Sequence, residues 1–287
     1  MNRYFLGCPM WANKSWVGTL FPTATKPGAF LRHYAQVFNS VEGNTTFYAV
    51  PSRETIAKWV KATPSTFRFA FKFPRTISHD MGLRACEAER DTFLQTLVPL
   101  GPRVGPIFLQ LPPTFDDFSG LERFLALLPR EFAYAVEARH PCFTGALEEA
   151  FVQLLQELEM DRVIFDTRLL MAFESEDPEI RGAQRRKPKS PVRTHATGPH
   201  PFLRFAGHPE PSENRDLLAF WADITAGWLQ QGRTPYIFMH QVPEDEKAPQ
   251  QARLFHQLLL ERVAGLAPMR PWPGEEEPPE PEQLSLF

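Results

Sequence analysis

Hydrophobic residues recur along the chain in eight short runs that are rich in β-branched or aromatic side chains. Runs of this length and composition are typical of strands buried in a sheet. We therefore expect eight strands. They are expected at Tyr4–Gly7, Val37–Glu42, Phe67–Phe73, Pro106–Leu111, Phe132–Glu137, Arg162–Asp166, Phe202–Ala206 and Tyr236–His240.

Stretches of helical period separate these runs. They are Pro27–Gln36, Ser52–Lys61, Cys86–Val98, Leu121–Leu128, Ala146–Leu158, Asn214–Gln230 and Pro249–Val263. Ser52 with Glu54 in the first turn is a typical helix start. Repeated alternation of strand and helix favours a parallel sheet, and eight such units over about 265 residues match a single TIM-type (β/α)₈ barrel.

Two segments break this rhythm. The stretch from Leu169 to Pro201 is long, basic and rich in proline, which predicts an elaborated loop after the sixth strand. Residues 269–287 are acidic and rich in proline, a composition that predicts a disordered tail. The expected organisation is therefore a barrel over residues 1–268 followed by a tail over 269–287.

Polar residues gather just after the apolar runs. In a (β/α)₈ barrel these carboxyl ends form the active face, so the asymmetry predicts a site there. The residues that follow or end the runs are Glu42, Asn44, Thr46, Tyr48, Lys72, Arg75, His79, Gln110, Glu137, Arg139, His140, Asp166, Arg204, His208, His240 and Gln241.

Four segments in the same order resemble the YecE-like family, a domain of unknown function numbered seventy-two. They begin at Val41, Phe69, Phe108 and Ala135, and the resemblance covers roughly residues 3–265. It implies a TIM-type barrel with a polar pocket at the strand carboxyl ends, but no settled reaction. It also implies pocket roles for Glu42, Asn44, Tyr48, Lys72, His79, Gln110, Glu137, Arg139, His140 and Arg204.

Glu42 and Glu137 end the second and fifth runs, so both are expected to point into one cavity. Two carboxylates there can act as acid and base or bind a divalent cation. Alternatively, each pairs with a neighbouring cation, such as Lys72 or Arg139, and only shapes the pocket. The sequence leaves both interpretations open.

A divalent metal is a further hypothesis. The expected metal ligands are Glu42, Glu137 and Asp166, because carboxylates at barrel strand ends suit a hard cation. The histidines His79, His140 and His240 would complete such a set, with His79 or His140 as an alternative proton donor. No tight histidine pair supports the metal, so it stays a hypothesis.

Cationic and aromatic residues favour an anionic ligand. Lys72, Arg75, Arg139 and Arg204 give the expected pocket positive potential, and Asn44, Gln110 and His240 supply hydrogen bonds. Tyr48, Trp11 and Trp16 offer faces on which a base or sugar can stack, although packing explains Trp16 equally well.

The charge balance changes once the tail is set aside. The chain has a net charge of −3, and the five glutamates of residues 275–287 account for five negative charges, which leaves +2 for the rest. A basic cluster lies in the long segment after the sixth run. Its members are Arg181, Arg185, Arg186, Lys187, Lys189 and Arg193. A solvated loop and an arm that touches phosphates both fit this cluster.

The last five residues resemble the peptide by which bacterial polymerases and repair enzymes bind the DNA sliding clamp. The resemblance implies that Gln283 hydrogen-bonds at the rim of the clamp pocket, with Leu286 and Phe287 inside it. Leu284 is a further apolar anchor. The alternative is an amphipathic end that packs on the body of the protein.

Compartment follows from composition. The three cysteines have no paired spacing, and no apolar run approaches a membrane span, so we expect a cytoplasmic protein without membrane contact. The leading hypothesis is a hydrolase of phosphodiester or glycosidic bonds that acts on nucleic acid or a phosphorylated fragment of it, tethered to the clamp. The alternatives are a barrel enzyme for a phosphosugar or organic acid and a non-catalytic binding module.

Overall fold

The computed structural model describes residues 4–243 and 245–275. Eight strands form one parallel sheet in the order β1-β8-β7-β6-β5-β4-β3-β2. The strands are β1 (Phe5–Gly7), β2 (Ser40–Gly43), β3 (Arg68–Lys72), β4 (Val104–Gln110), β5 (Tyr134–Glu137), β6 (Asp161–Asp166), β7 (Phe202–Ala206) and β8 (Tyr236–His240). The sheet curves into a nearly closed TIM-like barrel, as the sequence predicts.

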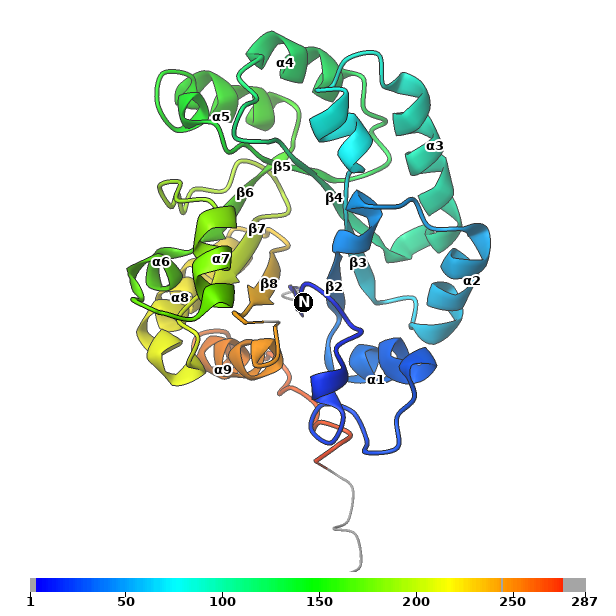
Figure 1. Cartoon of the computed structure of the whole chain (residues 1–287), viewed down its shortest axis with the longest axis vertical. Helices are drawn as coiled ribbons and strands as arrows, with labels where there is room; N and C mark the ends of the chain where they lie inside the picture. The colour runs from blue at the N-terminus through cyan, green and yellow to red at the C-terminus, as the bar shows by residue number, and fades with distance from the viewer. Residues whose placement is uncertain (1–3, 244, 276–287) are drawn as a thin grey trace, which may run out of the picture.

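Helices surround the strands (Figure 1). They are α1 (Phe30–Val37), α2 (Arg53–Ala62), α3 (Glu87–Leu97), α4 (Phe118–Ala126), α5 (Glu148–Glu157), α6 (Arg168–Ala172), α7 (Pro178–Arg186), α8 (Arg215–Gln230) and α9 (Ala248–Leu260). Local chemistry explains their starts: the Ser52 hydroxyl accepts a hydrogen bond from the Thr55 amide at the head of α2. The second strand begins at Ser40 rather than Val37, because α1 continues through Val37.

The barrel closes at a seam between β1 and β2. The Glu42 amide donates to the Cys8 carbonyl, and the Asn39 side chain bonds the backbones of Tyr4 and Leu6. A Cβ atom at Gly7 would overlap the Ser40 carbonyl oxygen, so glycine allows the two strands to approach. One backbone bond and the Asn39 side chain thus join the two edge strands, which share no ladder of backbone bonds.

Two layers of side chains fill the barrel interior. The lower layer is a separate apolar cluster contributed by β1 and by β3 to β8. Its members are Phe5, Ala70, Phe108, Ala135, Val163, Phe202, Tyr236 and Phe238. Successive side chains on a strand point to opposite faces, so residues two positions further along point into the same interior. That rule produces an upper layer of Lys72, Gln110, Glu137, Phe165, Arg204 and His240, with Glu42 from β2.

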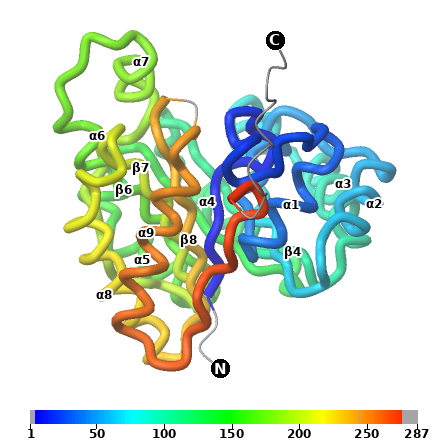
Figure 2. The backbone as a smooth tube through the Cα atoms, turned by 90° about the horizontal axis from the view of Figure 1, so that it is seen from below, coloured from blue at the N-terminus to red at the C-terminus, as the bar shows by residue number. Residues whose placement is uncertain are grey.

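The connection between β6 and β7 is elaborate, as expected, but it is not a plain loop. It contains α6 and α7, and α7 carries Arg181, Arg185 and Arg186. The Asp177 carboxylate caps α7 by accepting a hydrogen bond from the Glu179 amide. Figure 2 shows this excursion protruding from one end of the molecule.

The described part of the predicted tail packs on the barrel. Trp272 is 3% exposed, and the Arg253 guanidinium lies 3.5 Å from the centroid of its ring. Arg253 also forms a two-pronged ion pair with Glu275. Figure 2 shows this segment, in red, running beside α9 and the N-terminal elements in blue. The packed body therefore reaches Glu275, beyond the predicted boundary at residue 268.

Candidate functional site: a charged barrel mouth

Arg204 lies at the centre of the upper layer and joins two strands to β7. Its Nε and Nη2 atoms donate to the Glu42 carboxylate at 2.9 and 2.8 Å, and Nη1 donates to Glu137 at 2.5 Å. His240 Nε2 lies 3.2 Å from Glu42, and Asn44 donates to the same carboxylate at 2.6 Å. Arg139 Nε donates to the remaining oxygen of Glu137, so every carboxylate oxygen of both glutamates has a hydrogen-bond partner.

Burial acts to raise the pKa of both glutamates, but the cations outweigh it. Arg204 and His240 bring the pKa of Glu42 well below its usual range. Arg139 together with Arg204 and Lys72 brings the pKa of Glu137 to about 2. The glutamates in turn raise the pKa of Arg204 against the opposing effect of burial. The three groups are therefore charged and mutually paired, the arrangement in which the glutamates shape the pocket.

Lys72 is the buried cation that this pairing does not neutralise. Its Nζ atom donates to Gln110 Oε1 at 2.9 Å and lies 3.7 Å from the centre of the Phe47 ring. Arg139 Nη2 donates to the same Gln110 oxygen at 2.9 Å. Burial, reinforced by the charge on Arg204, lowers the pKa of Lys72 to about 7. Among the described residues, no carboxylate oxygen lies within 4.0 Å of Nζ.

Lys187 is a mouth residue that the sequence analysis placed only in the basic cluster. It follows α7, and its Nζ atom lies 5.2 Å from the centroid of the Phe165 ring in the upper layer. Burial and the nearby Arg204 lower its pKa to about 8, with Asp245 and Glu42 opposing them. The only hint in the sequence that Lys187 reaches the mouth was its place in the long connection after the sixth strand. The structure shows that this connection returns over the strand ends.

The other histidines have packing or hydrogen-bond roles. His79 contacts the Ser78 hydroxyl at 2.8 Å and packs edge-on against Phe47. Burial and the charge on Lys72 lower its pKa to about 4, so it is neutral at pH 7. His140 Nδ1 accepts a hydrogen bond from the Cys142 amide.

The rim residues divide into exposed and packed groups. Tyr48 is 81% exposed beside Phe47, and Arg75 is an exposed residue paired with Asp80. Trp16 is core: its indole nitrogen donates to the backbone carbonyls of residues 245 and 246. Trp11 packs edge-on against Trp59.

Asp166 does not join the site. Phe165 points into the barrel, so the next residue points outward. The carboxylate accepts hydrogen bonds from Trp221 Nε1 at 2.7 Å and from Arg168. The proposed set of three carboxylate ligands is therefore not assembled. Over 4–243 and 245–275, histidine, cysteine, aspartate and glutamate side chains form no group of three suited to a metal.

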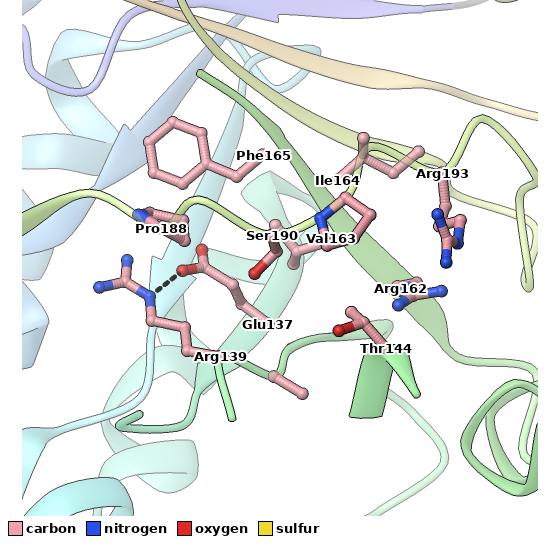
Figure 3. Close-up of a pocket in the computed structure, with 12 residues that line it drawn as sticks. Glu137, Arg139, Thr144, Arg162, Val163, Ile164, Phe165, Pro188, Ser190 and Arg193 are labelled. Carbon is pink, nitrogen blue, oxygen red and sulfur yellow. Dashed lines mark hydrogen bonds and ion pairs between the residues drawn. The ribbon is translucent and has the colours of Figure 1, made fainter. Parts of the chain in front are cut away.

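Three cavities adjoin this mouth. A small one, of about 30 Å³, lies beside Glu137 and Arg139 under the chain at Pro188 and Ser190 (Figure 3). A second, of about 420 Å³, is lined by residues that include Arg139 and Lys187. A third, of about 380 Å³, continues along the basic segment. Their shared lining residues place them next to one another.

These features define a TIM-like α/β barrel with a charged mouth at the carboxyl ends of its strands. The model of the family described as "Protein of unknown function DUF72" matches residues 5–277. The chain is also 38% identical to the UPF0759 protein YecE of Escherichia coli K12, with 99% of each chain covered. It therefore belongs to the DUF72, YecE-like family.

More distant relatives agree on the fold. A DUF72 family structure from Thermotoga maritima has a TM-score of 0.69 at 22% identity, covering 90% of this chain and 99% of its own. Another, from Enterococcus faecalis, has a TM-score of 0.65 at 20% identity, covering 90% and 97%. The UPF0759 protein YunF of Bacillus subtilis is 28% identical over 118 residues, which is 39% of this chain and 41% of its own.

Two further expectations concern the ends and the surroundings of the protein. Gln283, Leu284, Leu286 and Phe287 lie outside the described residues, so the clamp-binding interpretation stays a prediction. Within the described part of the chain, no helix has both the length and the apolar character needed to cross a membrane.

Proposed function

We propose that the barrel mouth binds an anionic group, and that the protein hydrolyses a bond in nucleic acid or in a phosphorylated fragment of it. The observation that carries this proposal is the imbalance of charge in the mouth. Among the described residues, four cations, Lys72, Lys187, Arg139 and Arg204, face three carboxylates: Glu42 and Glu137, which form ion pairs with the arginines, and Asp245, which acts on Lys187 without an ion pair. Buried cations without counter-charges are unfavourable unless a ligand supplies them.

The pairing supports different roles for different residues of the mouth. Glu42 and Glu137 hold Arg204 and Arg139 in place, because all their oxygens are bonded and their pKa values are low. Lys72 is the group suited to proton transfer, since a pKa near the working pH maximises that function. Arg139 and Lys72 converge on one Gln110 oxygen, so an anion there meets both cations.

The test is a hydrolysis screen with phosphorylated DNA and RNA oligonucleotides and with glycosidic substrates, each with several divalent metals. We expect activity in the wild type and a loss of at least about 100-fold in Lys72→Met, which removes the proposed proton-transfer group. Glu137→Gln should also lower activity, because it releases Arg139 and Arg204 from their shared partner. Lys61→Met is the matched control, because Lys61 is an exposed lysine on α2. A wild type that is inactive on every substrate would refute the hydrolase.

The saturated pairing of Glu42 and Glu137 favours one other candidate, a non-catalytic module that binds an anion. Carboxylates with low pKa values and occupied lone pairs are poor general bases. Sulfate binding without turnover, lost in Lys72→Met, would support this module over the hydrolase.

We also propose that the C-terminal peptide tethers the protein to the DNA sliding clamp, on the strength of the Gln283–Phe287 pattern alone. A synthetic peptide with this sequence should bind purified clamp, and Leu286→Ala with Phe287→Ala should abolish binding. Equal binding by both peptides would remove the proposed link to replication.

A further inference from the structure

A strip of unpaired cations runs from the mouth along the connection after β6. We define the phosphate strip as Arg185, Arg186, Lys187 and Lys189. Among the described residues, no carboxylate lies within 4.0 Å of any of these four side chains. Their neighbours differ: Arg181 pairs with Glu176, and Arg193 pairs with Glu148 through two hydrogen bonds.

The phosphate strip lines two cavities. The cavity of about 420 Å³ is bounded by all four of its residues and by Arg139, and the adjoining cavity of about 380 Å³ by Arg185, Lys187 and Lys189 with Arg181. No aspartate or glutamate is among the lining residues of either cavity. Both volumes lie within the range of ligand pockets, roughly 300–1,000 Å³. The surface is therefore concave as well as positive.

Lys187 and Arg139 connect the phosphate strip to the mouth. Lys187 lines both cavities, and its Nζ atom lies against Phe165, the ring that also packs 4.4 Å from the Arg204 guanidinium. Arg139 bonds Glu137 in the mouth and donates to the Arg186 carbonyl at 3.4 Å. An anionic chain that lies on the strip can thus extend into the mouth and remain close to cationic side chains along the whole path.

The dipole of α7 explains why some of these cations, but not all of them, occur at these positions. Arg185 and Arg186 occupy the last turn of α7, where the helix dipole stabilises cations. Lys187 is the C-cap of α7 and shares in this effect, whereas Lys189 lies two residues further along the chain. A row of like charges along a groove is the arrangement that tracks a phosphate backbone.

We propose that the phosphate strip binds the backbone of a single-stranded nucleic acid, with one phosphate of that strand in the mouth beside Lys72 and Arg139. This inference rests on the proposed anion site. Tyr48 follows β2, three strands from β5 in the sheet, and its exposed ring offers a face for an unpaired base. A duplex lacks such a free base, so the exposed ring favours a single strand.

The experiment measures binding of fluorescein-labelled, 5′-phosphorylated oligothymidylates of increasing length at several salt concentrations. Affinity should rise with length and fall with salt, with a slope of about −0.7 per phosphate contacted. The double variant Arg185→Gln/Lys189→Gln should weaken binding by roughly tenfold and flatten the slope by about 1.4, because two contacts are lost. Lys58→Gln/Lys61→Gln on α2 removes the same charge far from the mouth, on the opposite side of the barrel in Figure 1, and should change neither.

The outcomes separate this inference from the proposed function. If affinity does not depend on length while sulfate still binds in a Lys72-dependent way, the strip inference fails and the anion site stands. If neither sulfate nor oligonucleotide binds, both fail. Equal losses in the strip and α2 variants would refute the strip as a specific surface. Nucleic acid would be refuted as the ligand of the strip by two results together. Inorganic polyphosphate of equal charge would bind more tightly than the oligothymidylate, and Tyr48→Ala would not change the affinity for the oligothymidylate.

Discussion

The centre of the mouth and the phosphate strip are both cationic, but their charges are handled in opposite ways. Arg204 is buried and saturated by Glu42 and Glu137, whereas Arg185 and Lys189 on the strip have no carboxylate partner in the described chain. Lys72 and Lys187 lie between these extremes, close to the matched cluster but unpaired. Matched charges hold the barrel ends together, and unmatched charges remain available for a ligand.

The largest expected effect is on the matched cluster. Arg204→Met leaves two buried carboxylates without their shared partner, and breaking such a buried pair destabilises a protein by about 3–5 kcal/mol. Urea unfolding measures the change. The exposed Arg75–Asp80 pair is the control, and Arg75→Gln should change stability by less than about 1 kcal/mol. Equal losses of stability in the two variants would show that the buried Arg204 cluster stabilises the barrel no more than an exposed ion pair does.

Lys72→Met should have the reverse pattern, with a loss of binding but not of stability. A hydrogen bond to a charged group contributes about 1.5–3 kcal/mol, so sulfate affinity should fall by roughly 10- to 100-fold. The variant should unfold at the same urea concentration as the wild type or a higher one, because a buried unpaired cation is removed. Calorimetric titration and urea unfolding together check this. Lower stability with unchanged affinity would place Lys72 among the structural residues.

Asp166→Ala tests the outward orientation of that side chain. The substitution leaves Trp221 Nε1 without its buried acceptor, which destabilises a protein by about 1–3 kcal/mol. Sulfate affinity should not change, since Asp166 points away from the mouth. A large loss of affinity at unchanged stability would contradict this orientation.

The pH dependence of binding follows from the two lowered lysine pKa values. Sulfate keeps its charge between pH 6 and 9, so changes in its affinity report the protein. Lys72 and Lys187 are protonated below their pKa values of about 7 and 8 and lose the proton above them. Affinity should therefore be greatest at pH 6 and fall by up to about tenfold per unit above pH 7. The pKa values of Glu42 and Glu137 are lowered and that of Arg204 is raised, so these neighbours of Lys72 keep their charge across this window. A flat profile would contradict the assignment of both lysines.

The sequence predicted the strands well, because apolar runs and strand–helix alternation are local signals. It could also separate the mouth residues from Asp166. The two-residue period that runs from Ala135 to Glu137 and from Phe202 to Arg204 excludes Asp166, which follows the inward-facing Phe165. The sequence analysis grouped Asp166 with the mouth residues because it considered only the position at the end of the run and not this two-residue period.

Other features depended on tertiary structure. The pairing of Arg204 with Glu42 joins residues 162 positions apart, and no spacing rule specifies it. Lys187 reaches the mouth because the chain after α7 returns over the strand ends, a path that has no periodic signature. The sequence analysis did not predict α7 within the expected loop. The turns of this helix are polar and rich in arginine and lack a strong apolar stripe, and Asp177 and Pro178 provide only a local start signal.

The most direct test of the account measures proton uptake when sulfate binds. Calorimetric titration at pH 8 in two buffers with different ionisation enthalpies gives the number of protons taken up per sulfate. If the anion supplies the missing counter-charge, Lys72 should regain its proton, and the uptake should approach one proton or exceed it when Lys187 contributes. Sulfate that binds without proton uptake in the wild type would contradict the claim that these lysines await an anion.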